Sequence, residues 1–269
     1  MSNQLPPAHV SVKDFGKIKI HTLVTPDGMF ANATHIIELP SQLILVDGHF
    51  FAQYAQQFRE LADSLQKPIT RFYISHDHPD HYIGMGDAFA DAQVYALKEI
   101  KDAIARDGQK VLEERQQNFG PLIASKLNPP AFIVNPGEET IDGVRFLFEK
   151  LEHAESPIAL VIKLPDFGVL IAQDLVYNHA HLFITGPTQS WENALIRYRD
   201  QETYTTIFAG HGEPSGKEVF DKALAYLNKA TEILASAVNG NDYKTRILEA
   251  YPDYAAAGFI DIYLPFLFH

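Results

Sequence analysis

The sequence predicts a layered α/β domain followed by a helical C-terminal extension. Short apolar runs rich in β-branched residues alternate with longer segments whose apolar residues recur every three or four positions, which is typical of strands alternating with helices. After residue 214 only the helical pattern continues. A chain of 269 residues suits one layered domain of this kind. We therefore expect a single domain over 1–269, with its core at about 16–214 and the extension at 215–269.

The first half of the chain predicts strands at both ends of an amphipathic helix. Strands are expected at 17–24, 34–39, 42–47 and 69–75, where apolar residues alternate or run together between Pro, Gly or Ser. Between the last two, Phe51, Tyr54, Phe58 and Leu61 share one helical face, and this helix should end near Pro68. A helix starting near Gly84, a short strand at 92–97 and a charged helix at 98–118 complete this half.

The second half predicts a hairpin, a helix and one more strand before the extension. The hairpin joins strands 158–164 and 168–173 through the turn sequence PDFG, and a helix at about 190–200 leads to a strand at 205–210. In the extension, Ser215 with Glu218 fits a capping box, and Gly240 fits a helix stop.

Composition and charge exclude several classes of function. The chain has no cysteine, so any metal must be held by His, Asp or Glu. Its net charge of −12, without a long basic run, argues against binding nucleic acid. No apolar run is long enough to span a membrane, and the N-terminus MSNQLPPAHVSVKDF does not have the pattern of a secretory signal. We expect a cytoplasmic protein that acts on a small-molecule substrate.

Residues 74–84, ISHDHPDHYIG, crowd titratable groups at the end of a predicted strand. His76 and His78 are two residues apart, so their side chains should point the same way, whereas Asp80 and His81 can aim at a second point nearby. Imidazole and carboxylate groups suit zinc, iron and manganese. A merely polar surface turn is the alternative, but four ligand-type residues in this order after an apolar strand favour a metal site.

The pattern His76-x-His78-x-Asp80-His81 resembles the HxHxDH signature of the metallo-β-lactamase superfamily, in particular its glyoxalase II-like branch. Further matches follow the family's order along about 16–214. They are Asp47 in LILVDG, His153 in LEHAESP, Asp174 in VLIAQD and His211 in IFAGHGEP, all at expected strand ends or turns. Many members carry glycine where this chain has Glu152 and Gln173.

The resemblance implies a four-layer αββα sandwich with two divalent metal ions at one edge, zinc being expected and iron or manganese being alternatives. The family pattern gives the first ion His76, His78 and His153, gives the second ion Asp80, His81 and His211, and makes Asp174 the bridge. Asp47 is expected to hydrogen-bond the motif or a ligand without binding metal. The two ions would share a hydroxide that attacks an electrophilic carbon, phosphorus or sulfur.

Other residues near the motifs have predicted roles in catalysis and substrate binding. Asp80 is the candidate to orient the nucleophile or to pass a proton to the leaving group. Tyr177 and Asn178 are candidate neutral donors to a substrate carbonyl. His179 and His181 form a second H-x-H, but without a carboxylate they are expected to be loop or pocket-wall residues rather than another metal site.

The C-terminal segment 258–269, GFIDIYLPFLFH, is apolar and aromatic, so it should dock on the core, wall an apolar pocket or form a homo-oligomer contact. An apolar pocket would favour hydrolysis of a small ester, lactone or thioester. Alternatives are a mononuclear iron oxidoreductase like the persulfide dioxygenases, a metallo-phosphodiesterase, and a non-catalytic binding protein on the same scaffold. Metal analysis would separate the iron enzyme from the hydrolases.

Overall fold

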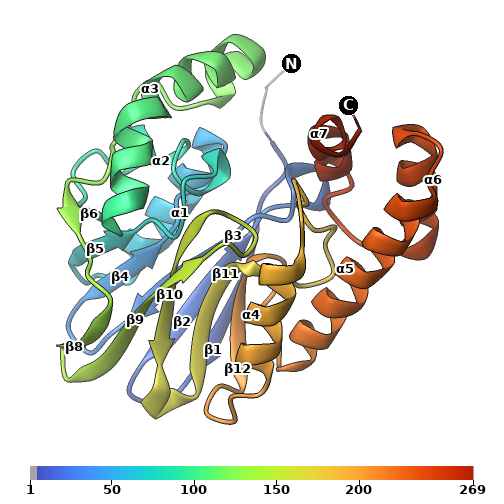
Figure 1. Cartoon of the computed structure of the whole chain (residues 1–269). Helices are drawn as coiled ribbons and strands as arrows, with labels where there is room; N and C mark the ends of the chain where they lie inside the picture. Colours follow the sequence, from blue (N-terminus) through green and yellow to red (C-terminus); the bar gives the residue numbers. More distant parts are fainter. Residues whose placement is uncertain (1–4, 269) are drawn as a thin grey trace.

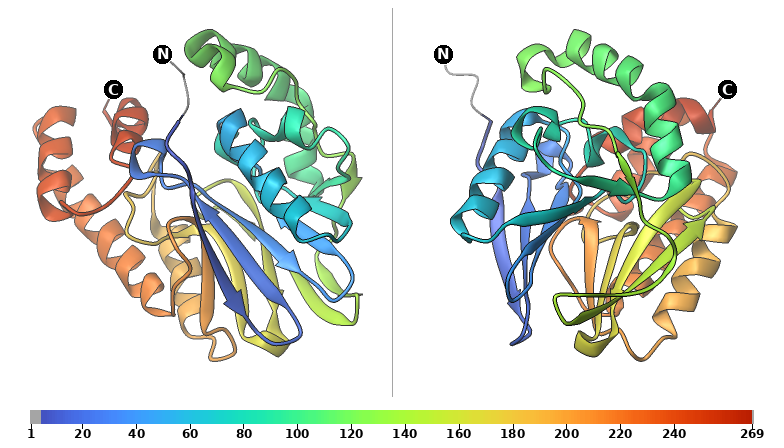
Figure 2. Two further views of the ribbon diagram at one scale, coloured as in Figure 1. Left: turned by 180° about the vertical axis from the view of Figure 1, so that it is seen from behind. Right: turned by 90° about the vertical axis from the view of Figure 1, so that its left-hand side faces the viewer.

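Two mixed β-sheets pack face to face, and helices cover both outer sides of the pair (Figures 1 and 2). The structure is a computed structural model that describes residues 5–268. The predicted αββα sandwich with helices at its C-terminal end is confirmed. Among the described residues, no helix combines the length and the apolar character needed to cross a bilayer.

The first sheet changes from antiparallel to parallel pairing at its fourth strand. Because β4 and β5 are parallel, their carboxyl ends meet at the same edge of the sheet. The strands follow chain order across the sheet: β1 His9–Asp14, β2 Lys19–Val24, β3 Ala33–Glu38, β4 Leu43–Val46, β5 Ile69–Tyr73, β6 Val94–Ala96 and β7 Phe132–Ile133.

The second sheet contains the predicted hairpin, which is confirmed as the antiparallel pair β10 and β11. Along β11, Val169 and Ile171 pack between the two sheets, whereas Leu170 and Ala172 pack in the second core under the outer helices. Both faces of this strand are therefore buried. Across the sheet the order is β12 Thr206–His211, β11 Val169–Tyr177, β10 Ile158–Leu164, β9 Val144–Glu152 and β8 Gly137–Ile141.

The helices divide between the two outer faces of the sandwich. Helices α1 to α3 lie on the side of the first sheet, and α4 and α5 cover the second, with α6 and α7 beyond them (Figure 1). Their bounds are α1 Ala52–Ser64, α2 Met85–Ala88, α3 Lys98–Phe119, α4 Gln189–Arg199, α5 Glu218–Ser236, α6 Gly240–Ala250 and α7 Gly258–Leu267.

Two predicted helix signals in the extension were wrong. Ser215 forms an isolated bridge with Ile207 rather than capping α5, which begins only at Glu218. Gly240 starts α6 instead of ending a helix, and the side chain of Asn239 caps α6 by accepting a hydrogen bond from the Asp242 amide. The strands β1, β7 and β8 were not predicted, because they are largely exposed and lack a strong apolar pattern. Strand β9 was also missed, although its apolar residues alternate.

The apolar C-terminal segment docks on the core as helix α7. Phe259, Ile260 and Tyr263 are buried in the second core, whereas Ile262 and Phe266 on the other face are exposed. Its last residue, His269, lies outside the described residues. Phe259 stacks on Phe30, with ring centroids 4.7 Å apart, and so joins the C-terminal helix to the N-terminal region.

Replacing Phe259 with alanine should lower the free energy of unfolding by about 3 kcal/mol, because a buried aromatic ring is lost and a cavity remains. Urea denaturation at neutral pH measures this change. Phe266→Ala is the matched control on the same helix, since Phe266 is 55% exposed and should change stability by less than about 0.5 kcal/mol. Equal effects of the two variants would contradict the docking of α7.

Stability should fall between pH 6.5 and 4 because of His35, which is buried between the sheets. Its Nε2–H donates to the Ala209 carbonyl at 3.1 Å, and its Nδ1 accepts from the Thr22 hydroxyl at 3.0 Å. Burial lowers the pKa of His35 from 6.5 to about 4. Between these two pH values His35 binds a proton in the unfolded chain but not in the folded chain. The free energy of unfolding therefore falls as the pH falls, and the decrease reaches about 3 kcal/mol below pH 4. Urea midpoints across this range should fall less steeply in His35→Gln.

Candidate metal centre

The histidine motif leaves the carboxyl end of β5 and turns at once. Pro79 is the first residue of a short 3₁₀ helix, Pro79–His81. The ring of proline fixes its φ at a value that suits this position. The turn brings the ring of His81 back against that of His76, with centroids 4.0 Å apart. Both imidazoles are buried. One short turn thus places histidines on two adjacent points, as the spacing predicts.

Two groups of ligand-type atoms come together at this edge of the sandwich. In the first, Nε2 of His76 lies 3.8 Å from a Glu155 carboxylate oxygen, and Nδ1 of His78 lies 3.3 Å from the other oxygen. In the second, Nε2 of His81 and of His211 lie 3.5 and 3.4 Å from Asp80 Oδ2. The sequence predicted each of these residues as a ligand except Glu155.

Asp174 lies between the two groups, in the predicted bridging position. Its Oδ2 is 3.5 Å from Nε2 of His76 in the first group, and 3.3 and 3.4 Å from Nε2 of His81 and His211 in the second. A single carboxylate oxygen therefore faces histidines of both groups. This is the arrangement that a bridging ligand between two cations requires.

In the structure Glu155, rather than the predicted His153, lies with His76 and His78. His153 has a left-handed backbone, with φ of 54°, directly after β9 ends at Glu152. The strand alternation therefore breaks at this residue, and the exposed imidazole lies outside both groups. Two residues later the Glu155 side chain is buried and turned toward His76 and His78. The only sequence signal for this carboxylate was its place in the same turn, AESP.

A bulge and a glycine let Asp174 enter the centre. The register of β11 against β12 shifts on both sides of Gln173, whose φ is 44°, and such bulges redirect side chains. On the neighbouring strand, a Cβ at Gly210 would lie 1.8 Å from Asp174 Oδ1. Any larger residue at Gly210 would displace the carboxylate, so the glycine before His211 has a steric role.

Asp47, which follows β4, accepts hydrogen bonds from residues of the histidine motif. Its carboxylate accepts from the Ser75 amide at 2.8 Å, from the Ser75 hydroxyl at 2.7 Å and from His81 Nδ1–H at 2.8 Å. The side-chain amide of Gln173 donates to it from the second sheet. These are the contacts predicted for Asp47, which lies outside both ligand groups.

Asp80 is held by a buried chain of polar residues on the first sheet. The Asn32 side-chain amide donates to Asp80 Oδ2 at 3.4 Å, and its carbonyl oxygen accepts from His49 Nδ1–H at 2.8 Å. His49 in turn accepts the Thr34 hydroxyl at 2.8 Å through Nε2. Neither Asn32 nor His49 belongs to a sequence motif, so neither was predicted as part of the site.

The hydrogen bonds at the back of the centre leave histidine nitrogens facing its interior. Nδ1–H of His81 donates to Asp47, and Nδ1–H of His211 donates to the Phe30 carbonyl at 2.8 Å. The Ser75 hydroxyl donates to Asp47 and so accepts from Nδ1–H of His76. All three imidazoles therefore present an Nε2 lone pair to the centre, which is how outer hydrogen bonds orient metal ligands.

The residues present fit divalent metal ions. Among the described residues, no hydrogen-bonding partner is found for a set of buried atoms at the centre: Nε2 of His76, His81 and His211, and Oε2 of Glu155. Buried polar atoms rarely lack partners, and coordination to metal would satisfy all of these.

The charges of the centre also fit cations. Burial and the nearby Asp174 carboxylate raise the pKa of Glu155 well above its ordinary value. Burial opposes protonation of His211, yet Asp174 and Asp80 raise the pKa of His211 to about 9. The contribution of Asp174 to both shifts, and that of Asp80 at His211, reflect negative charge at the centre, which divalent cations would neutralise.

The remaining candidate residues separate into two kinds. Tyr177 lines the cavity, and its hydroxyl donates to Asp174 Oδ2 at 2.9 Å, so it positions the Asp174 carboxylate. The Asn178 amide instead donates to the Glu213 carbonyl, and Asn178 does not line the cavity, contrary to its prediction as a substrate donor. His179 contacts Lys222 and buried His181 contacts Tyr226, so neither joins a metal group.

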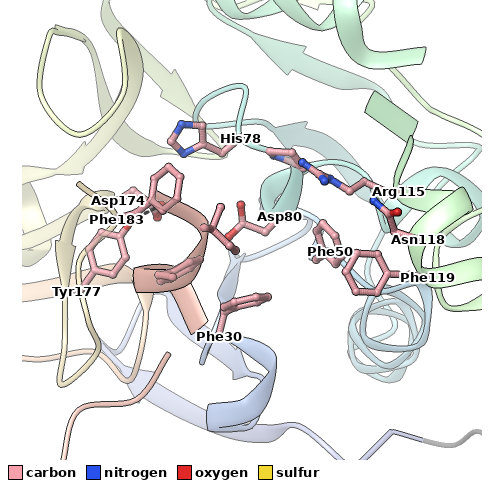
Figure 3. A pocket seen from close by; sticks show the side chains of 13 residues that line it. Phe30, Phe50, His78, Asp80, Arg115, Asn118, Phe119, Asp174, Tyr177 and Phe183 are labelled. Atoms are coloured by element: carbon pink, nitrogen blue, oxygen red, sulfur yellow. Dashed lines mark hydrogen bonds between the residues drawn. The ribbon is translucent and has the colours of Figure 1, made fainter. Parts of the chain in front are cut away.

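A cavity of about 320 Å³ opens onto the two groups (Figure 3). His78, Asp80, Asp174 and Tyr177 form its polar side, and Arg115 and Asn118 reach it from α3. The remaining wall is mostly apolar and aromatic, and it is made by Phe30, Phe50, Phe119, Phe183, Phe259 and Ile262.

Comparison with known protein families agrees with this geometry. Residues 27–211 match the family described as the Metallo-beta-lactamase superfamily. The chain belongs to the metallo-β-lactamase superfamily. The match ends at His211, the last residue of the second ligand group, so it includes every ligand-type residue of both groups.

Members of the metallo-β-lactamase superfamily with solved structures share the fold at low identity. A metallo-β-lactamase from Pontibacter korlensis aligns with a TM-score of 0.63 and 16% identity, over 82% of this chain and 99% of the other. FIM-1 from Pseudomonas aeruginosa, solved in its mono-zinc form, aligns with a TM-score of 0.60 and 17% identity, over 84% and 96%.

One curated relative is closer in sequence. The alkyl/aryl-sulfatase BDS1 of Saccharomyces cerevisiae is 27% identical over 180 residues, which are 54% of this chain and 28% of the relative. This metallo-β-lactamase superfamily chain therefore spans only about a quarter of the yeast protein's length.

Proposed function

We propose that this protein is a metal-dependent hydrolase that cleaves esters carrying an apolar alkyl or aryl group. The observation that carries the proposal is the aromatic cavity opening directly onto both ligand groups. An apolar wall of this size favours the body of a small ligand, and a few polar groups fix its orientation. Carboxylic esters, lactones and thioesters are the first substrate classes.

The residues of the centre would have separate roles in binding metal and in catalysis. His76, His78 and Glu155 would hold one divalent cation, zinc in our proposal, and Asp80, His81 and His211 would hold the other, with Asp174 shared. When bound, such ions lower the pKa of coordinated water toward about 7 and polarise the scissile group. Asp80 faces the cavity, where it can orient the nucleophile or hold a proton for the leaving group. The aromatic wall would contact the apolar part of the substrate.

A second candidate is hydrolysis of sulfuric esters. The relationship to a yeast protein named an alkyl/aryl-sulfatase supports it. In either reaction the apolar part of the substrate would occupy the same aromatic wall. The two candidates differ in the atom attacked, carbon or sulfur.

The experiment that tests the proposal pairs metal analysis of the purified full chain with a matched substrate panel. The panel contains aryl acetate and aryl octanoate, methyl and octyl sulfate, a lactone, a thioester and a phosphodiester. We expect two metals per chain, chelator-sensitive hydrolysis and at least about a tenfold preference in kcat/KM for the longer chain of the active ester class. One iron per chain with oxygen consumption would instead identify the dioxygenase alternative, and phosphodiester hydrolysis alone would identify the phosphodiesterase.

Asp80→Asn should lower turnover at least about a hundredfold at saturating metal, more than its loss of metal explains, because the variant can neither accept a proton nor balance charge. Asp77→Asn is the matched control, since Asp77 lies outside both groups and does not line the cavity. It should change turnover less than about twofold. Steady-state rates normalised to measured metal content decide the outcome, and equal losses would refute the role of Asp80.

A further inference from the structure

The α3 side of the cavity carries two polar side chains that the proposed chemistry does not use. Arg115 and Asn118 are three residues apart near the end of α3, so they project from the same face of the helix. Both line the cavity beside Phe119, and Figure 3 shows them extending into it from α3. A helix otherwise rich in solvent-exposed charge thus turns a cation and an amide toward the candidate metal centre.

Arg115 differs from the other arginines in its lack of an acidic partner. Within residues 5–268, no ion pair or hydrogen bond to another side chain is found for Arg115, although its side chain is half-buried. Every other arginine of the chain forms an ion pair with Asp or Glu: Arg59, Arg71, Arg106, Arg145, Arg197, Arg199 and Arg246. A guanidinium without an acidic partner, placed beside aromatic rings in a cavity, is available to pair with an anionic group of a ligand.

The charge of the loaded cavity also favours an anion. Two divalent cations would balance the three carboxylates of Asp80, Glu155 and Asp174 together with one bound hydroxide, so any net positive charge comes from Arg115. Arg115 adds positive charge to the same cavity. Because the wall is largely apolar, this field is less screened than it would be in water.

We propose that Arg115 and Asn118 bind an anionic group of the substrate, which is therefore an anionic amphiphile. This inference rests on the hydrolase function proposed above and names its substrate class. The planar guanidinium can donate two parallel hydrogen bonds to a carboxylate or sulfate, and the Asn118 amide can add a third. The alkyl or aryl body lies against Phe30, Phe119 and Phe259. The anion is either the scissile sulfate itself or a carboxylate elsewhere on a carboxylic ester.

The test measures binding without turnover, using the metal-loaded full chain and three ten-carbon probes in isothermal titration calorimetry. The probes are decanesulfonate, decanoate and the neutral alcohol 1-decanol. Arg115→Gln should lower the affinity for the anionic probes about tenfold or more, because a charge-assisted contact is lost. The affinity for the alcohol should not change. Arg115→Lys should recover part of the loss, and Asn118→Ala should show a smaller one. Arg106→Gln, which changes an exposed arginine paired with Asp107 on the same helix, is the control that should alter neither.

The outcomes separate this inference from the hydrolase proposal. Preference for decanesulfonate over decanoate indicates a sulfate group, and the reverse indicates a carboxylate. If Arg115→Gln weakens the alcohol and the anions equally, or if the native protein binds all three alike, the anion site is refuted even when esters are hydrolysed. If Arg115-dependent anion binding is measured and no ester is cleaved, the anion site stands and the hydrolase function fails.

Discussion

Replacing Asp174 with alanine is expected to deplete metal from both groups and to give the largest loss of activity of any single change. Its Oδ2 faces histidines of both groups, so one substitution removes a ligand from each. Outer partners of metal ligands already cost about 10–100-fold in affinity when they are lost, and a bridging ligand should cost at least as much. The metal content, measured by mass spectrometry after gel filtration, should fall from two ions per chain to less than one.

A suitable control for this variant is Asp166→Ala, because Asp166 lies in the exposed turn of the same hairpin and pairs with Arg145. It should keep full metal content. Circular dichroism of both variants checks that the sheets remain folded. Two ions bound to the Asp174 variant would show that the carboxylate is not a bridge.

Glu155→Gln is expected to remove one of two bound metals, because the variant keeps the shape of the side chain but loses its charge. The second group, Asp80, His81 and His211, does not include this residue and should still bind its ion. Bound metal should therefore fall from two ions to about one, and metal titration should show about 10–100-fold or more weaker binding at the first group only.

His153→Ala is the matched comparison, since it tests the ligand that the family pattern names. The exposed imidazole lies outside both groups, so the variant should bind two ions with unchanged affinity. If the two results were exchanged, with His153→Ala losing a metal and Glu155→Gln keeping both, the first group would be made as the sequence motif predicts.

Much of the candidate centre could be predicted because its ligands sit in short local motifs. His76, His78, Asp80 and His81 lie on one turn after one strand, and the end of a strand fixes where a side chain such as His211 must lie. Backbone alternation places His76 and His78 on one side of the strand exit, and the resemblance to the metallo-β-lactamase superfamily implied the rest of the ligand set. The sandwich itself followed from the same motifs in the same order.

The third ligand could not be chosen from sequence, because it depends on the conformation of a single residue. The left-handed φ of His153 turns its side chain outward and brings Glu155 in, and nothing in LEHAESP requires that φ. Arg115 was also beyond prediction, since its place in the cavity depends on how α3 packs over the sandwich. Contacts between distant segments leave no periodic signal in the chain.

The split of each ligand group between the two sheets has a consequence for how the protein matures. His76, His78, Asp80 and His81 follow a strand of the first sheet, whereas Glu155, Asp174 and His211 belong to the second. During synthesis the ribosome makes the first set long before His211, so a nascent chain first presents two of the four residues of the first group and two of the three residues of the second. Neither group is complete until the two sheets have docked, so we expect full metal binding only after that step.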